Sequence, residues 1–593
     1  MKKGILYILI SVFVFAVASC SDYLQEENKV DIDKNGFLND AAQVETVLYG
    51  VYQTTTAAPM YGWYQSFYFG IGTDCEYIND NGIDTWRTVP ANAYPTTQSE
   101  IQDAWRYLYI GVYRANDFLE RVSAKYDSYT EEEKPLITVY MAEARALRGL
   151  FYFELIRRFG HIPLITTTAM SYSDPREMVQ EDPAKVYEFI EADLKYAAET
   201  LPWATDDTYR KDNSFRFSKG AAMGLLAKVY ATWAGWPVKD TSKWELAAKT
   251  AGELIMSGKH DLLDDFEDLW KNTCNGKWDP TESLIEISFY SPTYKGSSDP
   301  SGRIGKWNGV LTSSIAGTRG RCAAQVKVTY SFIMDWRAED GVGVDKKGTK
   351  EEDDDEYFPN GTKPSGLFDK RRDLSIANYK YDHTLLDDPK EPILLTAEYT
   401  NGEYDPIKSM HSDLDPEKKV SAKQSYTPAK WDIEKYQNTS YLLNEDMSNV
   451  NWYVLRYADV LLLYAEALNE WKGGPTNEAY AAVNKVRRRA YGNPDNTLDC
   501  DLRIGLDQDN FREAVRKERK YELAFEGHRR LDLVRWDMYY ETIQQTYNDM
   551  VDLYPQARYI IQKYTVKGKH ELMPIPQREM DLCTKFDQNP GWK

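Results

Sequence analysis

The chain has 593 residues, of which 42% are hydrophobic and 28% charged, a balance typical of a folded globular protein. Its formal net charge of −20 at pH 7 repels the phosphates of nucleic acids and anionic lipid surfaces, so we exclude nucleic-acid binding. The 44 tyrosines and 16 tryptophans exceed what the core alone requires.

The first residues predict export. Lys2 and Lys3 precede an apolar run over residues 5–18, which is shorter than the roughly 20 residues that a transmembrane helix needs. Residues 1–19 are therefore interpreted as a signal peptide. The sequence Val-Ala-Ser-Cys at its end resembles the lipobox of bacterial lipoproteins, which implies lipidation of Cys20. The alternative is an ordinary cleavage site that happens to precede a cysteine.

Residues 20–39 are polar and acidic, and we interpret them as a flexible tether. Asp31, Asp33 and Asn35 match the first half of a calcium-binding loop. The bidentate acid that such a loop requires would fall on Ala42, however, so we predict a turn and no metal site.

The N-terminal region, residues 40–270, shows the apolar periodicity of helices. The predicted helices cover residues 40–56, 99–123, 135–159, 183–201, 218–234 and 242–257. The helix over 135–159 is expected to pair with that over 183–201, and the helix over 218–234 with that over 242–257.

One aromatic loop, residues 60–94, interrupts these helices and holds nine aromatic rings among glycines. We expect Phe67 and Phe69 in the core. Trp63, Tyr64 and Trp86 have polar neighbours, so we expect these rings at a surface. The candidate ligand contacts in this loop are Trp63, Tyr64, Asn79, Asp80, Trp86 and Arg87.

The middle region, residues 271–450, is loop-rich after a predicted strand over residues 281–290. The acidic run over residues 351–356 is interpreted as a solvated loop and not as a calcium site. Because long loops on a helical scaffold often carry function, we add Tyr290, Tyr294 and Trp307 as further candidate ligand contacts.

The C-terminal region, residues 451–593, returns to helical periodicity. Residues 452–471 are predicted to form one buried helix with a charged stripe that contains Arg456, Asp459 and Glu466. A second helix is predicted over residues 477–490, and a third from residue 511 with a break at Gly527. Short turns between them indicate antiparallel helix pairs of the tetratricopeptide kind, so we predict a mostly α fold.

The sequence offers little support for an enzyme. It lacks a GxSxG elbow, a phosphate-binding loop and an HExxH motif, and its six histidines are dispersed. Glu518, Glu522 and Glu526 share a helical face, as the carboxylates of a glycosidase could. Arginines interleaved with them would lower their pKa values and spoil a general acid, so we predict a structural ion-pair network and no catalytic residue. These arginines are Arg516, Arg519, Arg529, Arg530 and Arg535.

The cysteines show no CxxC pair and no metal-ligand spacing. Sequence alone leaves their disulfide state open. The five beyond Cys20 are Cys75, Cys274, Cys322, Cys500 and Cys583.

Several motifs together resemble the SusD/RagB family of outer-membrane nutrient-binding lipoproteins. They are the lipobox at Cys20, YRANDFL at 113–119, AEARALR at 142–148, RYADVLLLYAEA at 456–467, the acidic and basic pattern over 518–533, MPIP at 573–576 and NPGW at 589–592.

This resemblance implies a scaffold of four tetratricopeptide-like helix pairs, few short strands and long loop-rich insertions. It implies a lipid-anchored protein on the outside of the outer membrane that binds an oligosaccharide and delivers it to a SusC-like TonB-dependent transporter, without a cofactor. The alternatives are a peptide-binding RagB-like member, a lipoprotein glycoside hydrolase, and a transporter lid that binds no ligand.

Overall fold

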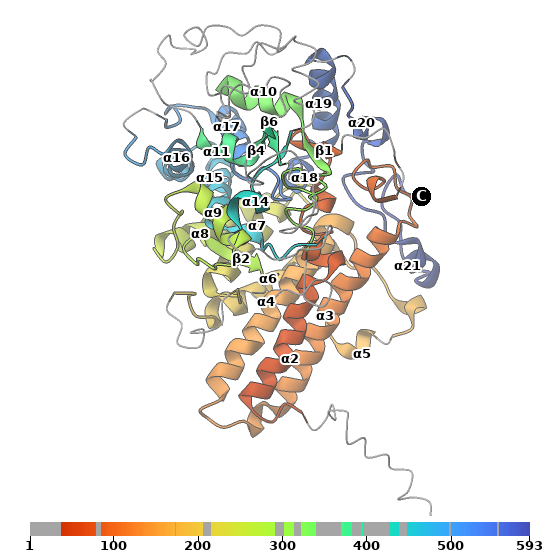
Figure 1. Ribbon diagram of the computed structural model, residues 1–593. Helices are drawn as coiled ribbons and strands as arrows, with labels where there is room; N and C mark the ends of the chain where they lie inside the picture. Colours follow the sequence, from red (N-terminus) through yellow and green to blue (C-terminus); the bar gives the residue numbers. More distant parts are fainter. Residues whose placement is uncertain are drawn as a thin grey trace, which may run out of the picture.

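The computed structural model (Figure 1) shows a helical molecule. It describes residues 37–78, 83, 85–171, 173–205, 215–290, 302–312, 322–339, 369–381, 393–394, 426–437, 447–496, 500–553, 555 and 557–593. The signal peptide, Cys20 and the tether up to residue 36 therefore lie outside the described residues.

The long helices form a continuous stack. Each packs against the next along the series α2, α3, α4, α6, α7, α8, α15, with α16 and α17 both on α15. The bounds are α2 (Ala41–Gln53), α3 (Ser99–Lys125), α4 (Lys134–Phe159), α6 (Pro183–Thr200), α7 (Lys219–Trp233), α8 (Lys243–Met256), α15 (Tyr457–Lys472), α16 (Asn477–Tyr491) and α17 (Gln508–Glu522). The predicted pairs α4–α6 and α7–α8 are confirmed, and so is the mostly α fold with tetratricopeptide-like pairing.

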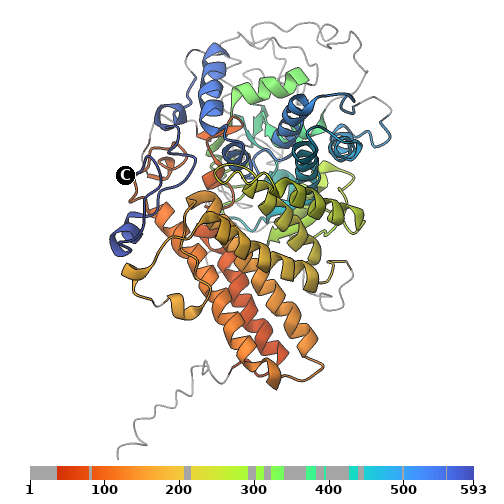
Figure 2. The same ribbon diagram turned by 180° about the vertical axis from the view of Figure 1, so that it is seen from behind.

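Helices α2, α3 and α4 extend together from one end of the molecule, whereas α10 (Tyr330–Glu339) and α19 (Tyr539–Leu553) lie side by side at the other end (Figures 1 and 2). The other helices of the described chain are short. They are α5 (Thr168–Ser171), α9 (Phe266–Cys274), α11 (Lys370–Ser375), α14 (Ile433–Tyr436), α18 (Arg529–Arg535), α20 (Ile561–Tyr564) and α21 (Gln577–Leu582).

Helix α4 is buried on nearly every side, so its charged residues need partners inside the protein. Arg148 donates two hydrogen bonds to Asp193 of α6, at 2.8 and 2.9 Å. Glu143 accepts two from Arg216, both at 2.8 Å. These pairs join α4 to its neighbours while leaving its apolar side chains free to fill the core.

The prediction of one helix over residues 452–471 is wrong at its start. Trp452–Arg456 is strand β8, which pairs antiparallel with β2 (Ser283–Ile287). All five of its residues are buried, and Trp, Tyr and Val favour the pleated backbone. The helix begins only at Tyr457, whose N–H donates to the Glu282 carbonyl at 2.8 Å. A buried run of this kind fits a helix or a strand equally well by periodicity.

The other strands are short and occur as antiparallel pairs. They are β1 (Glu76–Ile78) with β3 (Val326–Val328), β4 (Ile376–Ala377) with β7 (Thr427–Pro428), and β5 (Tyr379–Lys380) with β6 (Ile393–Leu394). Each pair joins segments of the loop-rich middle to one another or to the N-terminal region.

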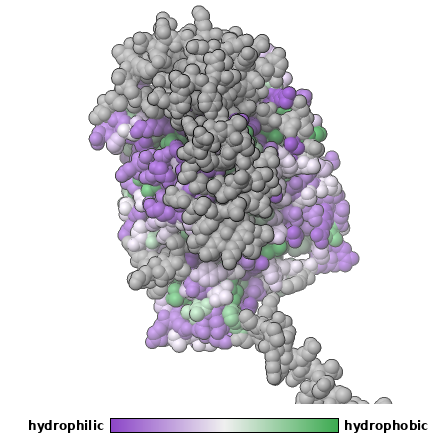
Figure 3. Space-filling model, viewed as in Figure 1, coloured by the Kyte–Doolittle hydropathy of each residue, from purple (hydrophilic) through white to green (hydrophobic). Residues whose placement is uncertain are grey.

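One hydrophobic cluster draws residues from the N-terminal, middle and C-terminal regions, from Leu38 to Trp592. Phe67 and Phe69 belong to it, as predicted. The five cysteines from Cys75 to Cys583 are free and buried. On the face shown in Figure 3, the described residues are mostly hydrophilic, and hydrophobic ones appear in small groups.

Candidate ligand-binding site

Five aromatic residues from distant segments meet in one group, the Trp86 cluster. Its members are Trp63, Tyr64, Tyr68, Trp86 and Trp307. Trp307 lies edge-on to both Trp63 and Trp86, with ring centroids 5.0 and 4.7 Å apart. Such edge contacts are favourable because the positive edge of one ring meets the negative face of the other. The structure thus joins the aromatic loop 60–94 to the middle region.

Backbone hydrogen bonds hold the segments of the cluster in place. The Arg303 N–H donates to the Gly62 carbonyl at 2.8 Å, and the Tyr68 hydroxyl donates to the Trp86 carbonyl at 2.7 Å. The Val326 N–H, at the start of β3, donates to the Trp307 carbonyl at 3.0 Å. A Cβ at Gly302 would lie 3.1 Å from the Gly62 carbonyl oxygen, so the two segments approach closely where glycine permits it.

Two arginines lie over ring faces of the cluster. The Arg303 guanidinium is 4.0 Å from the centroid of Trp63 and 4.8 Å from that of Trp307. The Arg87 guanidinium is 4.5 Å from the centroid of Trp86. These distances suit cation–π attraction, worth about 0.5–2 kcal/mol each. Arg303 was absent from the predicted contacts. Its position four residues before Trp307, in a loop that contains glycine, is a signal that could have suggested it.

The cluster has a buried interior and a more open side. Trp63, Tyr64 and Trp307 are only 8%, 9% and 6% exposed, so the prediction that Trp63 and Tyr64 stand at a surface is wrong. The rings fill space between loops that close on each other through the backbone. Trp86 and Arg87 are half-buried. Trp86 is therefore the most exposed of the three predicted tryptophans, and its ring makes a T-shaped contact with Trp307.

Of the remaining predicted contacts, the structure describes only Tyr290, which makes no ring contact with this cluster among the described residues. Tyr290 is half-buried, and its ring covers Gly276, where an added Cβ would lie 2.0 Å from the ring. Asn79, Asp80 and Tyr294 lie outside the described residues. Contact of all these residues with a ligand stays a prediction.

The carboxylates Glu518, Glu522 and Glu526 form a buried ion-pair network, as predicted. Arg456, which is 0% exposed, bonds Glu526 at 2.8 and 2.9 Å, Glu282 at 2.9 Å and Glu522 at 2.5 Å. Glu522 also pairs with Arg371 and Arg489. Burial opposes ionisation of Glu522, but Arg489, Arg456 and Arg371 outweigh it and hold its pKa well below the usual range.

Most of the cations in this network were missed. Arg371 pairs with Glu518 and Glu522, and Lys430 pairs with Glu526 at 2.7 Å. Both come from the loop-rich middle, where no periodicity links them to the helical acids. Of the interleaved arginines, Arg519 instead pairs with Asp459 and Asp532. Ionised, paired carboxylates cannot donate the proton that a glycosidase needs.

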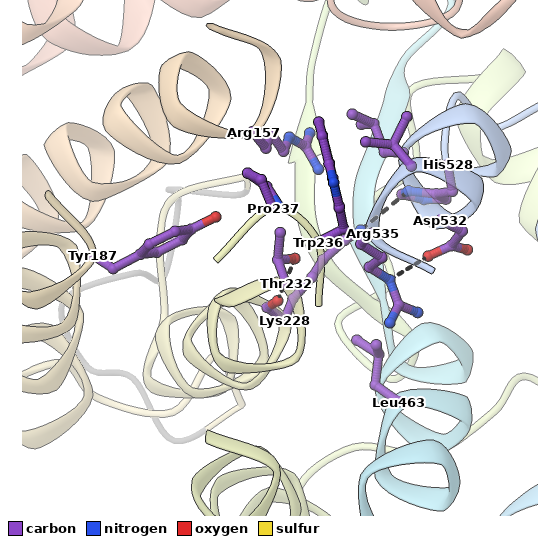
Figure 4. Close-up of a pocket in the computed structure, with 12 residues that line it drawn as sticks. Arg157, Tyr187, Lys228, Thr232, Trp236, Pro237, Leu463, His528, Asp532 and Arg535 are labelled. Atoms are coloured by element: carbon purple, nitrogen blue, oxygen red, sulfur yellow. Dashed lines mark hydrogen bonds and ion pairs between the residues drawn. The ribbon is translucent and has the colours of Figure 1, made fainter. Parts of the chain in front are cut away.

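A second buried polar group surrounds a small cavity of about 20 Å³ between α7, α15 and α18 (Figure 4). Lys228 donates to Asp459 at 2.8 Å and approaches His528 Nδ1 at 3.1 Å. Burial, and then the charge of Lys228, lower the pKa of His528 to about 3, so this histidine is neutral at physiological pH. The space holds about one water molecule, which excludes a sugar.

The whole chain was compared with known proteins. Residues 281–592, more than half of the sequence, match the sequence model of the SusD family. The chain belongs to the SusD family. Residues 22–231 also match a model described as "starch-binding associating with outer membrane".

Solved SusD structures agree with this assignment. A SusD homolog from Bacteroides thetaiotaomicron is 57% identical, has a TM-score of 0.86, and the match covers 96% of this chain and 100% of that one. A laminarin-binding SusD-like protein is 23% identical, with a TM-score of 0.63 over 93% of this chain and 100% of that one. At that identity, the second match shows the fold alone.

Among curated relatives, SusD-like protein P25 of Formosa agariphila is 25% identical over 604 residues, which is 97% of this chain and 96% of the relative. Within the described residues of this SusD-family protein, no three His, Cys, Asp or Glu side chains are grouped to hold a metal ion. None of the helices in those residues has both the length and the apolar character for crossing a bilayer.

Proposed function

We propose that this protein is a surface-exposed lipoprotein that captures a glycan and passes it, unaltered, to a SusC-like TonB-dependent transporter in the outer membrane. The observation that carries this proposal is the half-buried Trp86 ring, which is fixed by Trp307 and flanked by Arg87 in a SusD fold. A tryptophan face covers the apolar C–H face of a sugar ring, and an arginine donates hydrogen bonds to its hydroxyls. The match of residues 22–231 to a model described as starch-binding supports a glycan as the ligand.

The Trp86 cluster and Phe37, the first described residue, lie near opposite ends of helix α3. The Lys125 ammonium group, at the last residue of α3, donates to the carbonyl of Phe37, the first described residue. Tyr64 of the Trp86 cluster is close to Glu100 and Asp103 in the first turns of α3. A helix of 27 residues is about 40 Å long. The described part of the chain thus begins near the end of α3 that is remote from the cluster, which supports outward presentation.

Replacing Trp86 by alanine is expected to weaken glycan binding at least tenfold, about 1.4 kcal/mol, because the most exposed tryptophan of the cluster is removed. The measurement is isothermal titration calorimetry of residues 21–593 with a polysaccharide panel. Trp471→Ala, at a half-buried tryptophan near the end of α15, is the control and should keep wild-type affinity. Unchanged affinity of Trp86→Ala would remove Trp86 from the site.

The same calorimetry distinguishes the alternatives. Binding of peptides instead of glycans would favour a RagB-like peptide-binding member, and binding of neither would favour a structural lid. Release of sugar products that is lost on substitution of Glu522 would favour a glycoside hydrolase. The ion pairs of Glu522 with Arg371, Arg456 and Arg489 weigh against that last alternative.

Replacing Cys20 by alanine is expected to abolish acylation and release the protein from the membrane fraction. Two or more acyl chains hold a protein stably at a membrane, so their loss is expected to release it. Labelling of cells with an alkyne fatty acid, followed by capture of this protein, measures the outcome. Substitution of Ser21 is the control, and label that persists in Cys20→Ala would contradict the lipoprotein assignment.

A further inference from the structure

A cavity of about 650 Å³ lies between α10 and α19, above α17 and α18. The two helices that flank it are adjacent in Figures 1 and 2. It shares no lining residue with the Trp86 cluster, whose rings come from residues 63–68, 86 and 307. Its volume falls in the range of about 300–1,000 Å³ that is usual for small-molecule sites.

The floor of the cavity is a fixed group of charges. Asp74 is 8% exposed and accepts two hydrogen bonds from Arg529, both at 2.8 Å. Lys520 lies 3.3 Å from Asp74 and 3.0 Å from Asp335. Arg529 Nη1 is buried and has no hydrogen-bond partner within the described residues. The floor therefore contains a guanidinium that Asp74 holds in a fixed position.

The walls combine hydrogen-bonding groups with apolar surface. Helix α19 presents Glu541, Gln545 and Asp549 at four-residue intervals, so that they share one face. The apolar side chains of Met334, on α10, and Met538, just before α19, also line the cavity. Alternating polar groups and apolar surface match a sugar, which has hydroxyls around its edge and C–H groups on its faces.

The charge of the lining selects among sugars. Five carboxylates and two cations line the cavity, a net formal charge of −3. Lys567 pairs with Glu541 and reduces this local net charge to −2, so the lining stays acidic. Uronic acids and sulfated sugars would meet uncompensated like charge, whereas a neutral sugar would find both donors and acceptors.

We propose that this cavity is a second saccharide-binding site, selective for neutral over anionic sugar units. The ligand class rests on the glycan-binding function proposed above. A second site on the same molecule would bind a long glycan at two points, which raises the overall affinity without very tight binding at either point.

The test uses the two methionines that line the cavity. The methyl groups of Met334 and Met538 are labelled with carbon-13 in residues 21–593 and assigned by substitution with leucine. The protein is titrated to about 10 mM, above the 1 mM dissociation constant of a weak complex, with neutral gluco-, xylo-, manno- and laminari-oligosaccharides and with oligogalacturonate. We expect both methyl signals to shift with at least one neutral oligosaccharide and not with oligogalacturonate.

Thr542→Trp places an indole in the cavity and is expected to abolish these shifts. Asn548→Trp, at an exposed position of α19 outside the lining, is the matched control and should preserve them. Gln545→Trp serves as the filling variant if circular dichroism shows that Thr542→Trp is unfolded. Three results would each overturn the proposal. The first is that no neutral sugar shifts the two methyl signals, and the second is that oligogalacturonate shifts them equally. The third is that the shifts persist when tryptophan fills the cavity.

Measurements on Trp86→Ala separate a failure of the cavity proposal from a failure of the proposed function. If glycans bind in a Trp86-dependent manner while both methyl signals stay unmoved, the cavity proposal fails and the proposed function stands. If calorimetry detects no glycan binding at all, the proposed function fails. Methyl shifts that persist in Trp86→Ala would support two separate sites.

Discussion

Replacing Arg456 by methionine is expected to lower the free energy of unfolding by about 3–5 kcal/mol, the usual result of removing one partner from a buried ion pair. Arg456 is 0% exposed and is shared by Glu282, Glu522 and Glu526. Methionine fills part of the space but leaves three carboxylates with fewer cations. Urea denaturation monitored by far-ultraviolet circular dichroism measures the loss.

Arg176→Met is the control for this change, because Arg176 is 73% exposed and pairs with the nearby Asp174. We expect an effect within about 0.5 kcal/mol there, as for most surface pairs.

The loss of stability in Arg456→Met should shrink as the pH falls below about 4.5. Glu522 and Glu526 have folded-state pKa values below those of the unfolded chain, so their contribution exists above that pH and is lost on protonation. A loss under 1 kcal/mol at pH 7 would show that the network tolerates the absence of its central cation.

Replacing Glu76 by glutamine is expected to stabilise the protein by about 2–3 kcal/mol at pH 7. Glu76 is 1% exposed on β1, and its Oε2 has no hydrogen-bond partner in the described residues. Burial raises its pKa to about 8, against the opposing charge of Lys430, from an ordinary value of 4.5. Glutamine keeps the shape of the side chain and removes the ionisation.

The pH dependence of this effect has a definite sign. Between pH 4.5 and about 8 the folded state holds a proton on Glu76 that the unfolded chain has released, so rising pH favours unfolding through this window. The gain from Glu76→Gln should therefore be near zero at pH 4.5, grow with pH and level off above pH 8. Unfolding by urea across this range measures it, with the exposed Glu132→Gln as control. A gain that is the same at pH 4.5 and pH 8 would refute the burial of an ionisable Glu76.

The helical scaffold was predictable because long amphipathic helices repeat a local pattern. The bounds of α3, α4, α6, α7 and α8 lie within two residues of those predicted from periodicity and capping. The start of α15 was missed because Trp452–Arg456 is buried on both sides of a strand, so that no alternation marks it. Its partner β2 lies far away in sequence, and that pairing is a tertiary contact.

The sequence could predict which aromatic residues belong to the candidate ligand site, but not how they are arranged or which of them are exposed. The tryptophans at 63, 86 and 307 were each picked out by unusual neighbours, and the structure brings them together. Which ring is accessible depends on how distant loops close on one another, for example through the bond from Arg303 to Gly62. The same holds for the pairs of Arg371 with Glu522 and of Lys430 with Glu526, each of which joins residues more than 90 positions apart.

The burial of the five free cysteines has a practical consequence. A thiol-reactive probe reaches Cys75, Cys274, Cys322, Cys500 or Cys583 only when the surrounding structure opens transiently. The thiols are spread from the segment before β1 to the turn after α21, so their separate alkylation rates would report the opening of five distant parts of the molecule. Such rates could show, without any engineered label, which of these parts a bound glycan makes more rigid.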